Sequence, residues 1–320
     1  MRLCRFRHQG TVSAGIYDER RIVPLTAAAR AFESERGEKL GLVDSTDLLD
    51  FLPPAGAAHE AAQRLAVWVE QRGESLPAAL TLPNSAVELL TPIPRPNKLF
   101  LLAGNYADHI KEGGGIASER AETFPYVFMK PPTTTLTDPG KPIRIPDVSP
   151  KAIDWELELA VVIGRTCKGV QEAEALQYVA GYTVINDISD RKFRPNPQRK
   201  PREKDSFFDW LHGKWHDGFC PCGPCIRSAA DLPDPQTLPM QLKLNGQTRQ
   251  DASTALMIFP VAAIIEFISS FVTLEPGDII STGTPAGVGN TTGTYVGPGD
   301  TLEASITGIG TLVTPVRGGE

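Results

Sequence analysis

The chain has 320 residues, of which 41% are hydrophobic and 22% charged, so it can hold about two domains with a sizeable core. Its net charge of −6 argues against general binding to nucleic acids or to anionic membranes. The clearest apolar run, 259–268, contains Pro260 and Glu266 and is too short to span a bilayer, and no apolar stretch follows the basic N-terminus. We therefore expect a cytoplasmic protein that binds neither nucleic acid nor membranes.

Residues 1–93 are predicted to form a small α+β domain. Strands are expected at 3–6, 11–17 and 21–25, and helices at 27–36 and 57–71. The proline-rich stretch 91–96 cannot continue a helix or a central strand, so we interpret it as the linker to a second domain.

Residues 94–320 are predicted to form the main domain, which is predominantly β (α+β). The 57 glycines and prolines (29 + 28) favour short strands and many turns over long helices. The expected strands are 98–103, 126–130, 154–164, 181–187, 241–244, 247–250, 274–281, 301–306 and 310–316. The expected helices are 172–178 and 260–270.

Two carboxylates lie two residues apart on the strand expected at 154–164. Glu156 and Glu158 therefore share one face of it, and Asp187 ends the strand expected at 181–187. Burying unpaired carboxylates is costly, and a divalent cation held by their oxygens removes that cost. Three carboxylates favour Mg²⁺, Mn²⁺ or Ca²⁺ over Zn²⁺. The alternative is a solvated strand face on which Glu pairs with Lys or Arg across the sheet.

His109 and Glu112 lie three residues apart on a predicted helical turn, so their side chains can touch. A carboxylate orients an imidazole and raises its basicity, as a general base requires, although a simple surface pair has the same spacing. The glycine-rich stretch that follows is typical of a mobile lid. Lys130, before Pro131, is expected at a strand end, as an anion-binding cation or as an ordinary exposed lysine.

The cysteine cluster Cys220, Cys222 and Cys225 allows a rival hypothesis, a thiol redox or zinc-binding protein. A redox Cys-x-x-Cys motif opens a long helix, and here a proline-rich stretch follows instead. We therefore favour unpaired structural thiols.

The ordered motifs of residues 97–316 resemble the fumarylacetoacetate hydrolase family, in its bacterial form with an N-terminal extension. They are Gly104-Asn105-Tyr106 with His109 and Glu112, Lys130-Pro131, Trp155-Glu156-Leu157-Glu158, Gly181-Tyr182 through Asn186-Asp187, Gly213-Lys214, Asn245-Gly246 and Thr282-Gly283-Thr284-Pro285. The resemblance implies a mixed β-sandwich roll, a homodimer, and Mg²⁺ or a similar cation on Glu156, Glu158 and Asp187. It implies that His109 and Glu112 activate water and that Lys214 is the active-site lysine. The residues that it places near the substrate are Tyr106, Lys130, Arg191, Gly283 and Thr284.

Two departures from the family pattern concern the substrate. Arg194 stands where the family often has a substrate-binding glutamine, and a second carboxylate is a ligand that Arg194 suits. The segment after Lys214 also lacks the family's threonine.

The resemblance implies a metal-dependent hydrolase that cleaves a carbon–carbon bond in an acylpyruvate- or fumarylacetoacetate-like 2-oxo acid. The alternatives are a decarboxylase or an isomerase of unsaturated 2-oxo diacids at the same site, of the 2-hydroxyhepta-2,4-diene-1,7-dioate isomerase type, and a family member that binds ligand without turnover.

Overall fold

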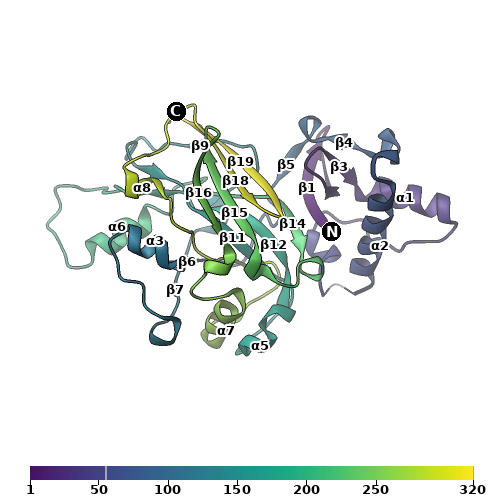
Figure 1. The fold of residues 1–320 in the computed structure, drawn as a ribbon. Coiled ribbons are helices and arrows are strands. Elements are labelled where there is room, and N and C mark those ends of the chain that lie inside the picture. The colour runs from purple at the N-terminus through teal and green to yellow at the C-terminus, as the bar shows by residue number, and fades with distance from the viewer. Residues whose placement is uncertain (55, 320) are drawn as a thin grey trace.

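The computed structural model describes residues 1–54 and 56–319, which form two central β-sheets with helices around them (Figure 1). The larger sheet has twelve strands among the described residues. They are β1 (Arg2–His8), β2 (Thr11–Tyr17), β3 (Arg21–Pro24), β4 (Leu82–Pro83), β5 (Glu88–Leu90), β6 (Leu99–Ala103), β7 (Tyr126–Met129), β8 (Leu136–Thr137), β11 (Leu157–Ile163), β12 (Val179–Asn186), β14 (Cys220–Ser228) and β17 (Ile279–Ser281).

The second sheet contains β9 (Ile143–Arg144), β15 (Pro239–Leu244), β16 (Gln247–Ser253), β18 (Thr301–Ile306) and β19 (Gly310–Arg317). A separate two-stranded ladder joins β10 (Ile153–Asp154) to β13 (Ser189–Asp190). The helices are α1 (Leu25–Arg36), α2 (Gly56–Arg72), α3 (Ala107–Glu112), α4 (Pro132–Thr135), α5 (Glu172–Ala175), α6 (Asp205–His212), α7 (Val261–Phe271) and α8 (Gly289–Thr292). No helix of the described residues is both long and apolar enough to cross a membrane.

The larger sheet runs through both predicted domains without a break. Its main strand order is β4-β3-β2-β1-β14-β12-β11-β17-β6-β7, so β1 of the N-terminal part pairs with β14 of the main part. In Figure 1 the N-terminal strands and α1 and α2 lie on one side of the molecule, and α3, α6 and β7 lie on the opposite side.

Two hydrophobic cores cover the two faces of the larger sheet. The first fills the space against the second sheet and contains Leu157, Leu159 and Leu302. The other contains Ala160 and Val162 and extends under α1 and α2. Because both faces are covered, every residue of β11 is buried, which explains its nearly continuous apolar sequence. The predicted α+β fold with packed sheets, predominantly β, is confirmed.

Most predicted elements are present, including the hairpin between β15 and β16. Asn245 and Gly246 form its turn with positive φ angles of 51° and 78°, which suit an asparagine and a glycine. The unbroken strand expected at 154–164 is wrong, because Trp155 and Glu156 leave the ladder. There a side-chain oxygen replaces the ladder acceptor, since the backbone N–H of Glu156 donates to Oδ1 of Asn186 at 2.9 Å. The strand expected at 274–281 is also shorter, and covers only β17.

Candidate active site

The three predicted metal ligands come together at the ends of two neighbouring antiparallel strands. Glu158 lies on β11, Glu156 directly before it, and Asp187 directly after β12. The strand register brings Asp187 beside Glu156, where the Asp187 N–H donates to the Glu156 carbonyl at 2.8 Å. One carboxylate oxygen from each of the three residues lies within 4.8 Å of the others, and all three residues are buried.

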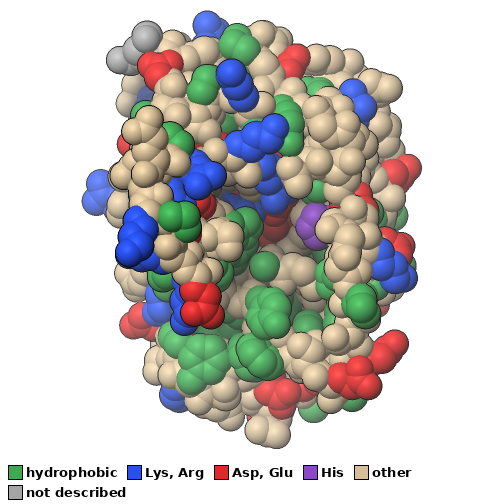
Figure 2. All heavy atoms as spheres, turned by 90° about the vertical axis from the view of Figure 1, so that its left-hand side faces the viewer, with side chains coloured by type: hydrophobic (Ala, Val, Ile, Leu, Met, Phe, Trp, Pro, Cys, Tyr) green, Lys and Arg blue, Asp and Glu red, His purple; other side chains and the backbone are tan. Residues whose placement is uncertain are grey.

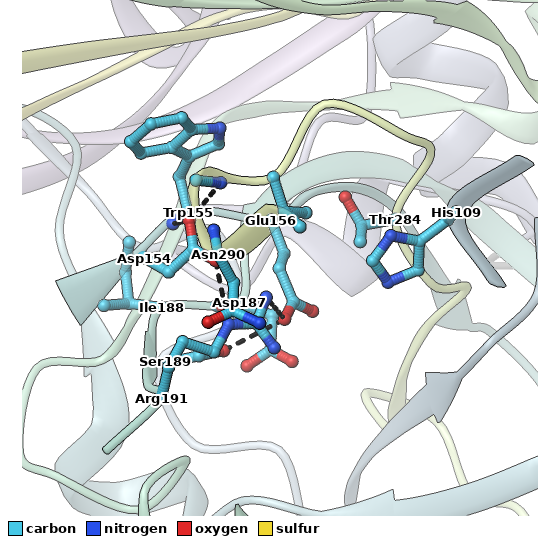
Figure 3. A network of polar contacts seen from close by, with 12 residues as sticks. His109, Asp154, Trp155, Glu156, Asp187, Ile188, Ser189, Arg191, Thr284 and Asn290 are labelled. Carbon is cyan, nitrogen blue, oxygen red and sulfur yellow. Dashed lines mark hydrogen bonds and ion pairs between the residues drawn. The ribbon is translucent and has the colours of Figure 1, made fainter. Parts of the chain in front are cut away.

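Three cationic side chains surround two of these carboxylates. Lys214 Nζ lies 2.9 Å from Glu156 Oε1 and 2.5 Å from Asp187 Oδ2. Lys130 forms an ion pair with Asp187, and Arg191 Nη2 lies 2.6 Å from Glu156 Oε1 (Figure 3). Burial by itself would raise the pKa of Glu156, but Lys214 and Arg191 outweigh it and lower the pKa to about 2. Glu156 is therefore ionised at neutral pH.

Glu158 differs because no cationic side chain pairs with it among the described residues. Its Oε2 accepts hydrogen bonds from Ser281 Oγ at 2.6 Å and from the Gly283 N–H at 2.9 Å. Its Oε1 is buried and has no partner in the described part of the chain. Burial and the neighbouring Asp187 and Glu156 charges raise the pKa of Glu158 well above its usual range. A divalent cation would give this oxygen a partner, so the residues present fit Mg²⁺ or Mn²⁺.

The predicted general base, His109, and its partner Glu112 lie on α3, at the edge of the same site. His109 Nδ1 lies 2.8 Å from Glu112 Oε1, and the Gly287 N–H donates to Glu112 Oε2 at 2.9 Å. Both side chains are partly exposed. Because Nδ1 faces the carboxylate, Nε2 is left to accept a proton. The geometry therefore matches an oriented general base.

One small cavity, of about 60 Å³, connects His109 with Glu156, one of the three carboxylates. Its lining includes His109, Glu156, Arg191, Lys214 and Thr284. In the space-filling view this face of the molecule is hollowed, with acidic and histidine side chains in the hollow, basic side chains above it and hydrophobic side chains below it (Figure 2). Figure 3 shows His109 and Thr284 on one side of Glu156 and Arg191 on the other.

The remaining predicted substrate contacts occupy different surroundings. Gly283 holds Glu158 through its N–H, and the buried Tyr106 donates its hydroxyl to Met240 Sδ at 3.4 Å. Arg194 lies on the exposed loop after β13. The interpretation of Lys130 as an exposed lysine is wrong: it is buried, and its Nζ donates to the Ile188 carbonyl at 2.9 Å besides pairing with Asp187. The substrate roles of these residues, and of Arg191 and Thr284, stay predictions.

Sequence reasoning missed two polar supports of the site. Asp154 is fully buried and accepts a hydrogen bond from Arg191 Nε at 2.8 Å. Ser281 holds Glu158 from β17. The spacing of Asp154, two residues before Glu156, is a signal that could have identified it, whereas no local pattern marks Ser281.

The cysteine cluster lies in β14, not at the start of a helix. All five cysteines are free and buried, and burial raises the pKa of Cys220 and of Cys225 to about 12. In the described residues the one group of three or more metal-ligating side chains is the carboxylate cluster. The cysteines are unpaired and buried, and their purely structural role stays a prediction.

Two family descriptions match the chain. Residues 98–317 match "Fumarylacetoacetate (FAA) hydrolase C-terminal", and residues 1–92 match "Rv2993c-like, N-terminal". Protein Rv2993c of Mycobacterium tuberculosis is 39% identical over 281 residues, which cover 87% of this chain and 97% of that protein.

Two further relatives carry named activities. The mitochondrial oxaloacetate tautomerase fahd2 of Xenopus laevis is 36% identical over 73% of this chain and 70% of its own length. The structure of maleylpyruvate hydrolase from Sphingobium sp. SYK-6, in complex with manganese(II) and pyruvate, superposes with a TM-score of 0.70 at 29% identity, and each chain is covered completely.

Proposed function

Because this chain belongs to the fumarylacetoacetate hydrolase family, we propose that it is a divalent-metal-dependent hydrolase of an acylpyruvate- or fumarylacetoacetate-like 2-oxo acid. One observation carries the proposal: His109, which is paired with Glu112, lines the same cavity as Glu156 of the carboxylate cluster. A base for water and a site for a cation are the two parts that cleavage of such a carbon–carbon bond requires.

Glu156, Glu158 and Asp187 would hold the cation, either Mg²⁺ or the Mn²⁺ present in the maleylpyruvate hydrolase structure. When bound, the cation supplies Lewis-acid polarisation of the oxygens of a 2-oxo acid. The unpartnered Oε1 of Glu158 supports this assignment, since the other two carboxylates already have ammonium or guanidinium partners.

The other side chains of the site would have separate roles in the reaction. His109 Nε2 accepts a proton from water, and Glu112 holds the imidazole in place and stabilises its positive charge. Lys214 and Arg191 keep Glu156 ionised. The buried cluster excludes bulk water, which strengthens each of these electrostatic contacts.

A second candidate is tautomerisation, isomerisation or decarboxylation of a 2-oxo diacid at the same site. The frog tautomerase favours it, since that protein shares 36% of its aligned sequence with this chain. The same His109–Glu112 pair can remove a proton from carbon instead of water.

The test is a panel of acylpyruvates, oxaloacetate and unsaturated 2-oxo diacids, each assayed with Mg²⁺ and with Mn²⁺. Two carboxylic-acid products from an acylpyruvate would support hydrolysis. Keto–enol interconversion, migration of a double bond or release of CO₂ would support the second candidate. The variant His109→Asn lacks the proposed base, so it should lose the activity, whether hydrolysis or the second candidate reaction. Turnover that survives this variant, or that persists after complete removal of divalent cations, would contradict the proposal.

The predicted homodimer is also a proposal, and one surface supports it. β7 is the last strand of the larger sheet, and a largely apolar groove of about 720 Å³ lies along it. Phe124, Tyr126 and Phe271 line this groove and are more than half exposed. Such a patch on a free sheet edge is a typical association surface. Light scattering of the native chain and of Phe124→Ser/Phe271→Ser would test it, since a dimer should dissociate in the variant.

A further inference from the structure

Asp154 lies outside the cluster of candidate ligands, yet its side chain connects two parts of the site: the carboxylate cluster and the His109–Glu112 pair. Its Oδ1 accepts hydrogen bonds from the N–H groups of Trp155 at 2.8 Å and of Gly289 at 2.7 Å. Its Oδ2 accepts from Arg191 Nε at 2.8 Å and from the Asn290 N–H at 3.0 Å (Figure 3). Four donors thus converge on one carboxylate that is fully buried.

Arg191 connects Asp154 to the carboxylate cluster. This guanidinium uses Nε for Asp154 and Nη2 for Glu156, which lies 2.6 Å away. Asp154 therefore fixes the direction in which Arg191 approaches a candidate metal ligand. A guanidinium that bridges two carboxylates is restricted more strongly than one with a single contact.

The base is reached through residues 287–291, a turn that runs into the first residues of α8 and that Asp154 and Trp155 hold in place. Asp154 accepts from two backbone N–H groups of the turn, and Trp155 Nε1 donates to the Gly287 carbonyl at 3.1 Å. The other side of the same residue, the Gly287 N–H, donates to Glu112, the partner of His109. The turn thus transmits the position of Asp154 to the base.

The packing leaves the turn little room to move. A Cβ on Gly289 would lie 1.9 Å from the Thr294 carbonyl oxygen and 2.7 Å from Asp154 Oδ1. A Cβ on Gly287 would lie 2.1 Å from the Arg249 carbonyl oxygen, and φ of Gly287 is +103°. A support that is both hydrogen-bonded and closely packed can hold a side chain to a fraction of an ångström.

We infer that Asp154 is a positioning residue that sets the placement of the His109–Glu112 pair relative to the carboxylate cluster, through Arg191 on one side and the turn 287–291 on the other. The inference rests on the proposed function for the meaning of that placement, but the placement itself can be measured without a substrate.

The variant Asp154→Asn removes part of the hydrogen bonding at this position and keeps the shape of the side chain. Whichever terminal atom becomes the amide nitrogen, it then faces two N–H donors that have lost their acceptor. We expect the Arg191 contact or the turn to shift, and Glu112 to shift with it.

The readout is the nuclear magnetic resonance spectrum of the histidine rings in the ¹⁵N-labelled protein. The chain has five histidines, so the His109 signals can be assigned by their loss in His109→Gln. Glu112→Ala, which removes the partner of His109, shows how these signals respond when the contact is broken. We expect Asp154→Asn to move the His109 signals in the same direction, although Asp154 does not touch His109.

Asp278→Asn is the matched control. Asp278 is also a fully buried aspartate that accepts backbone hydrogen bonds and pairs with a cation, Lys98, but it lies away from the turn. This variant should lose stability and leave the His109 signals unchanged. If a 2-oxo acid substrate is found, Asp154→Asn should lower kcat about 10- to 100-fold with little change in KM.

Unchanged His109 signals in a folded Asp154→Asn protein would overturn the inference, as would equal shifts in Asp278→Asn. If Asp154→Asn does not fold, Trp155→Phe removes the indole donor to Gly287 together with part of the buried ring, and should give a smaller shift of the same kind. Absence of a shift there would likewise overturn it. Because the spectra need no substrate, failure of every activity assay would count against the proposed function alone.

Discussion

The Lys214 ammonium lies 2.9 Å from Oε1 of Glu156, although 58 residues separate the two in the chain. Both side chains are almost completely buried, and the same ammonium contacts Asp187. The lysine therefore compensates charge within the group of side chains that would hold the cation. Phe128 and Trp210 surround it, with ring centres 5.4 and 5.8 Å from Nζ, and keep bulk water away.

Replacement of Lys214 by Met should destabilise the metal-free protein by about 3–5 kcal/mol, because it leaves buried carboxylates without a partner. Added Mg²⁺ should then stabilise the variant more than the native protein, since the cation takes over the compensation. Urea denaturation with and without Mg²⁺ measures both effects. A variant that is as stable as the native protein without metal would contradict this account of Lys214.

Glu158→Gln should abolish high-affinity cation binding while the fold persists. Glutamine retains one oxygen for Ser281 and Gly283, but it removes the charge of the one carboxylate of the cluster that has no cationic partner among the described residues. Isothermal titration with Mn²⁺ checks this, with Glu174→Gln on the exposed surface as the control. Native-like Mn²⁺ binding by Glu158→Gln would remove this residue from the set of ligands.

The stability of the metal-free protein should fall as pH rises above the ordinary carboxyl pKa of 4.5. The folded-state pKa of Glu158 is raised, so the folded protein holds a proton that the unfolded chain releases. This contribution is fully present below the unfolded pKa and is lost as pH passes through the folded one. Unfolding in chelator across a pH series should show the slope in the native chain and a smaller slope in Glu158→Gln. Equal slopes would disprove it.

Glu112→Gln should lower kcat about 10- to 100-fold and leave Mn²⁺ affinity unchanged. The amide still touches His109 but cannot stabilise an imidazolium, whereas the carboxylate cluster has no contact with Glu112. Steady-state kinetics and metal titration on the same preparation separate the two effects. A loss of metal binding would show that Glu112 supports the cation site, which would contradict its proposed role beside His109.

The five thiols should resist modification in the native state, because all are buried and burial raises the pKa of each. Titration with Ellman's reagent should show no fast-reacting thiol in the folded protein and five after denaturation. A fast-reacting pair, or zinc that remains after dialysis against Mg²⁺, would revive the redox or zinc hypothesis for Cys220, Cys222 and Cys225.

Local patterns determined much of what could be predicted from this chain. The two-residue spacing predicts that Glu156 and Glu158 meet, which they do although Glu156 lies just before β11. The three-residue spacing on a helix brings His109 to Glu112. Asn245-Gly246 predicts its hairpin because its backbone angles are a property of two residues. Each of these inferences needs only a short segment, so the sequence alone was sufficient.

Only the tertiary structure decided which distant groups meet. The ladder breaks at Trp155 and Glu156 because the Asn186 side chain accepts the hydrogen bond from the Glu156 N–H. Lys130 is buried because it forms an ion pair with Asp187. The spacing of Asp154 from Glu156 is a sequence signal, but its contacts with Arg191 and with residues 287–291 depend on the tertiary structure. Such contacts depend on strand order and register across the sheet, which reflect the packing of the whole chain and leave no periodic mark in any one segment.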